Sequence, residues 1–156
     1  MLDTNVQALD TKDWRERFVK RDLPLAYLMV RATMGFHMIA HGGVRLPILR
    51  EFAAETRKDF FGVTLLGLSL FPEWLITLIS YAIPPVEFMI GLLLTVGFKT
   101  RLASTTGSLL FLVMMFGTVA RRNFATAHIM WFYVMIFALL GGLSFADRYS
   151  LDRMKK

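Results

Sequence analysis

The sequence predicts an all-α integral membrane protein: a four-helix bundle with both termini in the cytoplasm, an amphipathic N-terminal segment and an interfacial outer segment between spans 1 and 2. Three observations predict this class. Apolar residues make up 55% of the 156 residues, and the mean hydropathy is +0.50; soluble domains usually contain about 45–50% apolar residues. These residues gather into four long runs that can serve as membrane spans. The charged residues, with a net charge of +6, lie in short blocks between the runs, which favours a membrane surface over nucleic acid.

The first segment, 1–23, is expected to be a cytoplasmic amphipathic helix that ends before Pro24. It lacks the proportions of a signal peptide, so the first apolar run is expected to stay in the mature protein. Trp14 and Phe18 are four residues apart and therefore share a helix face. That face either lies on the membrane or anchors a partner subunit. The cations that can reach anionic headgroups are Lys12, Arg15 and Lys20.

The four spans follow from the apolar runs, since a helix needs about 20 mainly apolar residues to cross a bilayer. The third run is the shortest and opens with the small residues "ASTTGS", which favour close helix packing. The expected spans are about 24–43, 74–98, 102–120 and 124–146, within a transmembrane domain 24–148 that precedes a cytoplasmic tail, 149–156.

The segment between the first two spans combines charges with apolar residues at helical spacing. Ile48, Phe52 and Phe60 have the pattern of a helix that lies on the membrane surface. The following run, "FGVTLLGLSLFP", is too short to span and is expected at the interface or against the mouth of the bundle, with Pro72 as its end.

The direction of insertion follows from lysine and arginine in the short connections. The leader, the connection after the second span and the tail hold five, two and four such residues, against six in the remaining connections. Both termini are therefore expected in the cytoplasm, with the protein in the bacterial inner membrane.

Ionisable residues within spans usually face the protein interior, because charge in lipid is costly. Arg31 in the first span and Glu87 in the second are estimated to lie at depths that their long side chains can bridge, at about 1.5 Å of helix per residue. We therefore expect an Arg31–Glu87 ion pair, either as a structural lock or as part of a proton-transfer site. Pro84 and Pro85 precede Glu87 and weaken the helix there.

Histidines are the other polar feature of the spans. His37 and His41 share a helix face, and His128 is predicted in the same outer half as His41. Haem between His41 and His128 is one interpretation, and interfacial histidines that bond to neighbours are the other. Trp131 and Tyr133 are typical of an interfacial aromatic belt. With no cysteine, thiolate metal sites are excluded, and no metal site is predicted.

Several motifs resemble the DoxX family of small four-span bacterial membrane proteins. Its first helix resembles the span that holds Arg31 and ends in "HG" (residues 41 and 42). The stretch "PVEFMIGLLLTVGFKTRLA" resembles the family pattern at Glu87, Gly91, Gly97, Thr100 and Arg101, and the closing segment is similar at Ser150, Leu151 and Asp152. The resemblance covers about residues 25–153, and the long leader and longer first outer segment depart from it.

The resemblance implies a four-helix bundle with links to quinone or sulfur redox chemistry. In one hypothesis the chain is a quinone-linked redox component, in which Glu87 accepts protons, His37 or His41 hydrogen-bonds a quinone oxygen, and Arg31 tunes Glu87. The catalytic candidates are then Glu87 and His37, and the ligand-binding candidates are Arg31, His41 and His128. Quinone and haem are then the cofactors considered, and electrons come from a partner or a bound cofactor. In the alternative the chain is a non-catalytic subunit of a larger respiratory or electron-transfer complex. A transporter ranks third, because the sequence shows no repeated halves. Whether the protein is an enzyme stays open.

Overall fold

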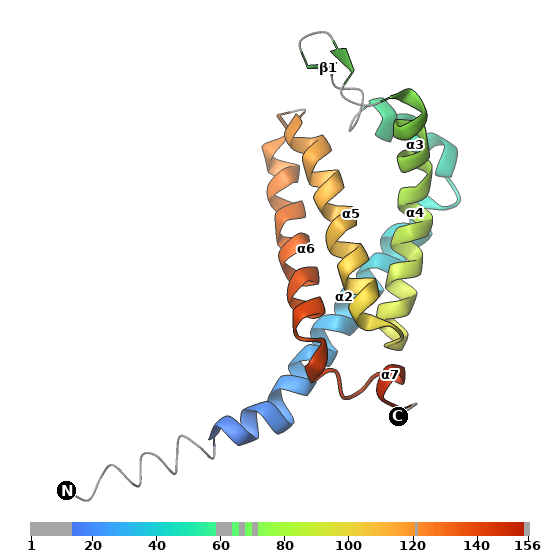
Figure 1. The fold of residues 1–156 in the computed structure, drawn as a ribbon. Coiled ribbons are helices and arrows are strands. Elements are labelled where there is room, and N and C mark those ends of the chain that lie inside the picture. Colours follow the sequence, from blue (N-terminus) through green and yellow to red (C-terminus); the bar gives the residue numbers. More distant parts are fainter. Residues whose placement is uncertain (1–13, 59–63, 66–67, 70–71, 121, 155–156) are drawn as a thin grey trace, which may run out of the picture.

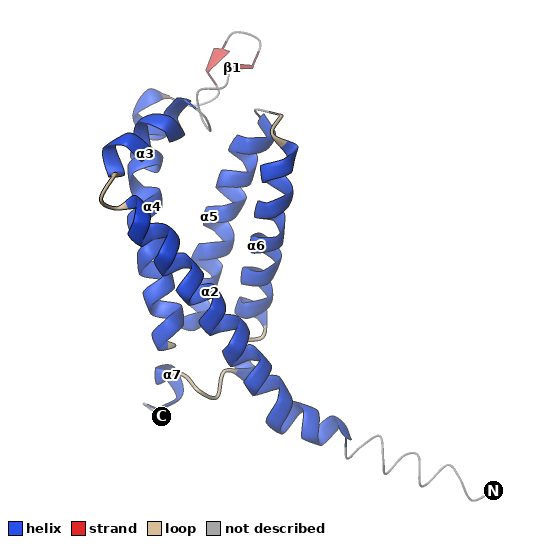
Figure 2. Cartoon of the chain, turned by 180° about the vertical axis from the view of Figure 1, so that it is seen from behind, coloured by secondary structure: helices blue, strands red, loops and turns tan. Residues whose placement is uncertain are grey.

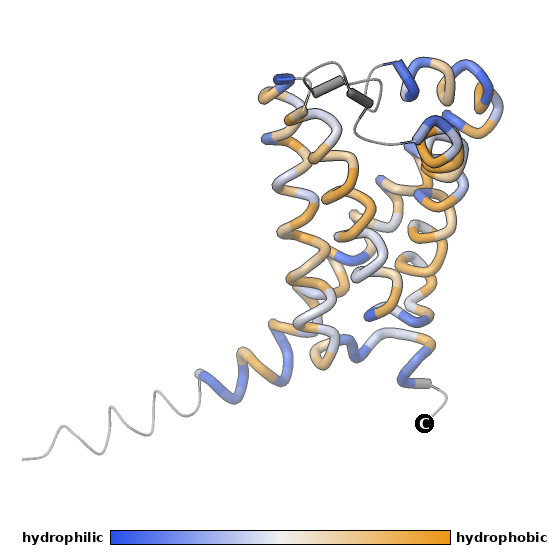
Figure 3. The backbone as a smooth tube through the Cα atoms, turned by 45° about the horizontal axis from the view of Figure 1, so that its top comes forward, coloured by the Kyte–Doolittle hydropathy of each residue, from blue (hydrophilic) through white to orange (hydrophobic). Residues whose placement is uncertain are grey.

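The computed structural model of the protein describes residues 14–58, 64–65, 68–69, 72–120 and 122–154, and its fold is a bundle of helices (Figure 1). Four helices are long and apolar enough to cross a membrane, so the chain is a multi-pass membrane protein. They contain α2 (Leu23–Arg45), α4 (Glu73–Val96), α5 (Thr100–Ala120) and α6 (Phe124–Gly142). Hydrophobic residues dominate these helices and hydrophilic ones gather toward their ends (Figure 3). The predicted all-α four-helix membrane bundle is confirmed.

The first helix is longer than expected, because it runs without a break from Trp14 to Arg45. The part of the leader that the structure describes, from Trp14 onward, is helical as predicted, and the rings of Trp14 and Phe18 lie 6.4 Å apart on one face. The predicted stop before Pro24 is wrong: a wide π-turn, η1 (Phe18–Asp22), joins the leader to α2, and Leu23 N–H donates to the Phe18 carbonyl. Lys12 lies outside the described residues.

Pro24 is tolerated because a distant side chain compensates for the hydrogen bond that it cannot make. A proline in a helix leaves the carbonyl four residues earlier without its usual partner; here that carbonyl belongs to Lys20. The guanidinium of Arg148 donates to this oxygen at 2.9 Å. The C-terminal arm therefore supports the helix at the position where the sequence predicted an end.

The bundle consists of two tightly packed pairs, α2 with α4 and α5 with α6. Glycine permits the first pair to meet backbone to backbone. A Cβ atom on Gly42 would lie 2.6 Å from the backbone nitrogen of Phe88, and one on Gly91 would lie 2.5 Å from that of Ile39. Figure 2 shows α2 crossing the bundle obliquely. This contact places the part of α2 that carries His37 and His41 beside the part of α4 that carries Glu87.

Small residues also line the α5–α6 contact, as the "ASTTGS" segment predicted. A Cβ atom on Gly107 would lie 2.7 Å from the ring of Phe137, and Ser108 Oγ donates to the Val134 carbonyl at 3.3 Å. The outer faces of the spans carry large apolar side chains that a bilayer would cover. Examples that are more than half exposed are Met29, Phe36, Leu109, Phe116, Phe132 and Leu139.

The outer connection holds a short helix, α3 (Leu49–Thr56), and a hairpin of two-residue strands, β1 (Thr64–Leu65) and β2 (Leu68–Ser69). Phe52 of α3 is half-buried against the core, whereas Ile48 is exposed, and Phe60 lies outside the described residues. Pro72 precedes the first turn of α4, as expected for the end of this segment.

The predicted fourth span is too long at its C-terminal end, since α6 ends at Gly142 rather than at residue 146. Gly141 and Gly142 disfavour helix continuation, and the chain turns through η3 (Ser144–Ala146) into α7 (Leu151–Met154). We call residues 143–154 the C-terminal arm. It lies at the same end of the bundle as Trp14, the first described residue (Figure 1).

Candidate functional site

Glu87 is the most deeply buried acid of the spans, with 1% of its surface exposed, one turn after Pro84 in α4. Its partner is Arg45: Arg45 Nη1 lies 2.7 Å from both carboxylate oxygens. The predicted Arg31–Glu87 pair is therefore wrong. The depth estimate considered only residues within the predicted spans. Arg45, the last residue of α2, lies just beyond the predicted first span, but its long side chain reaches back into the bundle.

Arg45 connects Glu87 to the end of the bundle that carries α3. Its guanidinium lies 4.9 Å from the centre of the Phe52 ring in α3, which is within the range of a cation–π contact. A quarter of the Arg45 side chain remains exposed, in contrast to Glu87. The carboxylate is thus neutralised by a cation that itself reaches the surface.

His37, His41 and Arg45 form a stripe on α2, because successive members are four residues apart. The two imidazole rings lie 4.2 Å apart. On its other side the His37 ring stacks on Tyr133 of α6, with 5.1 Å between centroids and 19° between planes. Tyr133 in turn stacks on Phe111 of α5 at 4.7 Å. Four rings from three helices therefore form one row that leads toward the Glu87–Arg45 pair; we call it the ring row.

The predictions for three α6 residues have different outcomes. Tyr133 is half-buried in the ring row, so its assignment to an outer aromatic belt is wrong, whereas Trp131 is exposed on the outside of the bundle. His128 is five residues from Tyr133, which rotates it about 140° around the helix. It is exposed, and the ring against His41 is that of His37. The structure therefore does not bring His41 and His128 together around a haem.

The ring row has the chemistry of proton exchange and flat-ligand binding. Imidazole both donates and accepts protons, and a carboxylate beside an arginine can accept further hydrogen bonds from a ligand. Across the described residues, no group of three or more histidine, aspartate or glutamate side chains is placed to hold a metal ion. Sequence reasoning could have found Arg45, because it follows His37 and His41 at the same four-residue spacing.

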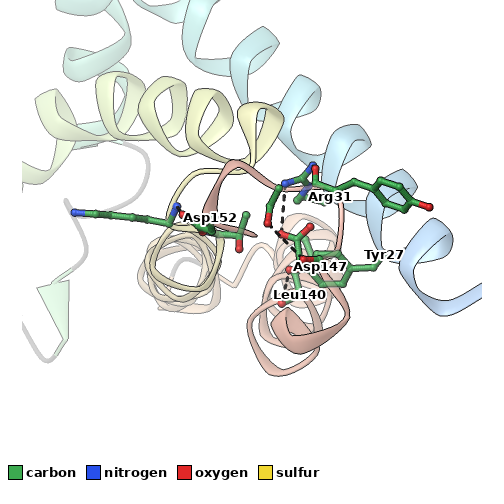
Figure 4. A network of polar contacts seen from close by, with 9 residues as sticks. Tyr27, Arg31, Leu140, Asp147 and Asp152 are labelled. Atoms are coloured by element: carbon green, nitrogen blue, oxygen red, sulfur yellow. Dashed lines mark hydrogen bonds and ion pairs between the residues drawn. The ribbon is translucent and has the colours of Figure 1, made fainter. Parts of the chain in front are cut away.

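Arg31 belongs to a second buried cluster, at the opposite end of α2 (Figure 4). Its Nη1 donates to Asp147 Oδ2 at 3.4 Å and its Nη2 donates to the Tyr149 carbonyl at 3.0 Å. Nearby, the Tyr27 hydroxyl donates to the Leu140 carbonyl at 2.9 Å. Arg31 and Asp147 are both almost completely buried. We call this cluster the C-terminal latch, because it fixes the arm to α2.

Two further residues complete the latch. Gly97 has φ +75°, which glycine adopts without strain, and a Cβ atom there would collide with Arg31 Nη1. Asp152 accepts hydrogen bonds from the backbone N–H groups of Lys99 (2.9 Å) and Thr100 (3.1 Å). Asp152 therefore caps α5. Sequence reasoning missed Asp147 because the search for buried charges covered only the predicted spans, and this residue follows the last of them.

Burial raises the pKa of Asp147 above its usual 3.8, and the nearby carboxylate of Asp152 adds to that rise. The Arg31 charge and hydrogen bonds from Thr100 and Ser150 act in the opposite direction. The net rise means that desolvation outweighs the attraction of Arg31. One carboxylate oxygen of Asp147 and Nε of Arg31 also lack a hydrogen-bond partner.

The chain matches no protein-family model, no curated protein and no solved structure. The resemblance to the DoxX family remains a prediction that rests on the motifs quoted above.

Proposed function

We propose that this multi-pass membrane protein is a quinone-linked component of a redox system in the bacterial inner membrane, with both termini in the cytoplasm. The observation that carries the proposal is the ring row beside the Glu87–Arg45 pair. A quinone needs a flat apolar contact for its ring and hydrogen-bonding groups that exchange protons at its oxygens. The ring row and the buried carboxylate supply both kinds of group.

In this proposal His37 or His41 bonds a quinone oxygen, and Glu87 accepts a proton. Quinone reduction takes up two electrons and two protons; the electrons come from a partner subunit or a bound cofactor, and the protons reach the quinone oxygens through carboxylate and imidazole. Arg45 takes the role first expected of Arg31, since it is the cation bonded to Glu87. Arg31 is instead a residue of the latch.

Membership of the DoxX family is part of the proposal, and the motif residues have structural roles that support it. Gly91 permits the closest α2–α4 contact, Gly97 makes room for Arg31, and Asp152 caps α5 at Thr100. These residues preserve a fold rather than a reaction. The resemblance therefore supports the architecture more strongly than it supports quinone chemistry.

Binding of decylubiquinone to the purified full-length protein in detergent micelles tests the proposal. His37→Ala should weaken binding about tenfold, the equivalent of one lost hydrogen bond, and Glu87→Gln should slow quinone turnover with the native donor. His128→Ala is the matched control, because this histidine is exposed on α6. Absence of quinone binding, or an equal loss in the His128 variant, would refute the proposal.

An accessory role within a larger complex is favoured by a different observation. Trp14, Phe18 and Val19 are about half exposed on the leader helix, where they can contact lipid or another subunit. Native electrophoresis after gentle solubilisation, with and without residues 1–20, distinguishes these contacts. Loss of a larger assembly from a truncated protein that still inserts would support docking. Migration of the full chain as a small free bundle would exclude the accessory role.

A further inference from the structure

A cavity of about 570 Å³ lies at the latch end of the bundle, outside the ring row. It is formed between the first turns of α5 and the C-terminal arm. The residues that matter to its chemistry are three cations and one hydroxyl residue: Lys99, Arg101, Arg153 and Ser144. Neither the proposed quinone site nor the leader uses this cavity.

The acids of the cavity are committed to other partners, whereas its cations keep most of their donors, although Lys99 Nζ lies 5.6 Å from the centre of the Phe98 ring. Asp152 accepts from two backbone N–H groups, and Asp147 is buried against Arg31. Within the described residues, none of the three cations forms an ion pair. Arg153 uses one nitrogen to donate to the Phe145 carbonyl and keeps further N–H donors. The cavity therefore presents excess positive charge.

The position of two of these cations is unfavourable for the helix that they flank. The N-terminus of a helix carries partial positive charge, so nearby cations repel it. Lys99 and Arg101 flank the start of α5 at Thr100, and the first turn of α5 contains no acid. Asp152 offsets only part of this repulsion. The positive-inside rule accounts for cations on this side of the membrane, and an anion in the cavity would relieve their repulsion of the helix N-terminus.

The depth of the cavity indicates where that anion comes from. α5 begins and α6 ends at the level of the cavity, so it lies where two spans leave the apolar layer. Leu102 lines the cavity, and Phe145 and Tyr149 adjoin the lining residues Ser144 and Ser150 in the sequence; all three are about 60% exposed. Apolar and aromatic side chains at this depth contact acyl chains and the glycerol region. A soluble phosphate would gain nothing from them.

We propose that this cavity binds the phosphate of an anionic phospholipid headgroup, with Lys99, Arg101 and Arg153 as its cations. Basic recesses at the ends of membrane helices recognise such headgroups. Ser144 supplies a hydroxyl donor to the headgroup oxygens, whereas the Thr105 hydroxyl donates to the Arg101 carbonyl. The acyl chains lie along the exposed apolar side chains of the border.

The test measures lipid binding to the delipidated full-length protein in neutral detergent by native mass spectrometry. Phosphatidylglycerol is compared with phosphatidylcholine, and millimolar inorganic phosphate is added in a separate arm. Arg101→Gln and Lys99→Gln should each weaken phosphatidylglycerol binding about fivefold. Both side chains are exposed and repel the N-terminus of α5, so thermal unfolding without lipid should stay unchanged or shift to a higher temperature. Arg50→Gln, an equal loss of exposed charge on α3, should bind like the wild type.

Three outcomes overturn the proposal. Equal binding of phosphatidylcholine shows that charge does not select the lipid. An equal loss in Arg50→Gln shows attraction by net charge alone. Displacement of phosphatidylglycerol by inorganic phosphate, with the same dependence on Arg101 and Lys99, assigns the cavity to a soluble phosphate compound.

Discussion

The two buried ion pairs of α2 differ in almost every physical respect. Glu87 and Arg45 meet at 2.7 Å, and the cation is a quarter exposed beside histidine and aromatic rings. Arg31 and Asp147 meet at 3.4 Å with both side chains about 3% exposed, and each leaves one polar atom without a partner. In the first pair the hydrogen bonds are short and the arginine reaches the surface. In the second pair both side chains are shielded from solvent and some polar atoms have no hydrogen-bond partner.

The difference is consistent with the proposed ligand site at Glu87 and with a structural role for the latch. A buried charge that is removed from its partner is strongly destabilising, although an intact buried pair contributes little. The latch joins α2 to a segment more than a hundred residues later and thereby fixes the C-terminal arm. The Glu87 pair joins adjacent spans that glycine contacts already hold together. It is therefore free to serve a ligand.

The largest expected effect is on the latch. Arg31→Met leaves Asp147 buried without a cation and removes the donor to the Tyr149 carbonyl. We expect the free energy of unfolding to fall by about 3–5 kcal/mol, measured by denaturant titration in micelles. Arg50→Met, on the exposed face of α3, is the control. A loss no greater than that of the control would show that the latch does not stabilise the fold.

A second substitution tests the space around Arg31 without removing a charge. Gly97→Ala places a methyl group against the guanidinium and requires a left-handed conformation, so we expect a loss of about 1–3 kcal/mol. Gly142→Ala is the matched control, because no atom lies within 4 Å of its Cβ position. Thermal unfolding of both variants compares them. Equal melting temperatures would contradict the close contact.

A double-mutant cycle sharpens the assignment of partners. Glu87→Gln combined with Arg45→Gln should show a coupling free energy of about 1–3 kcal/mol, because the two side chains are bonded. Glu87→Gln combined with Arg31→Gln should be additive within about 0.5 kcal/mol, since they share no partner. Unfolding of the single and double variants in one detergent supplies both values. Coupling to Arg31 in place of Arg45 would reverse the assignment.

The smallest expected effect is a pH dependence from Asp147. Its pKa is raised in the folded protein, so the native state binds this proton more tightly than the unfolded state. The resulting stability is complete below the usual value of 3.8 and is lost as the pH rises through the raised value. Wild type should therefore gain stability relative to Asp147→Asn as the pH falls from 7. A melting-temperature difference that moves the other way would contradict the burial argument.

Apolar runs predicted the spans well, because length and hydropathy decide whether a helix crosses a bilayer. Partners within the bundle were harder to predict. Depth along the chain suggested Arg31 for Glu87, but it omits the azimuth of each residue and the reach of Arg45 from the end of α2. Asp147 was missed for a related reason: it follows the last span, and only the return of the C-terminal arm buries it.

Local signals were reliable where a single element decides the outcome. The four-residue spacing of Trp14 and Phe18 placed their rings on one face, and small residues marked the α5–α6 contact. Pro24 misled because its effect on the helix depends on Arg148, which is more than a hundred residues away. A proline predicts a break only when no distant donor is available to its orphan carbonyl.

The unbroken first helix acts as a rigid arm. Its 32 residues extend about 48 Å, at 1.5 Å per residue, whereas the hydrocarbon layer is about 30 Å thick. The excess emerges at the latch end, where Arg148 braces the helix against the C-terminal arm. A small change in the tilt of α2 would therefore displace Trp14 farther than it displaces residues within the bilayer. In this way the leader would amplify a motion of the membrane-spanning part of the helix.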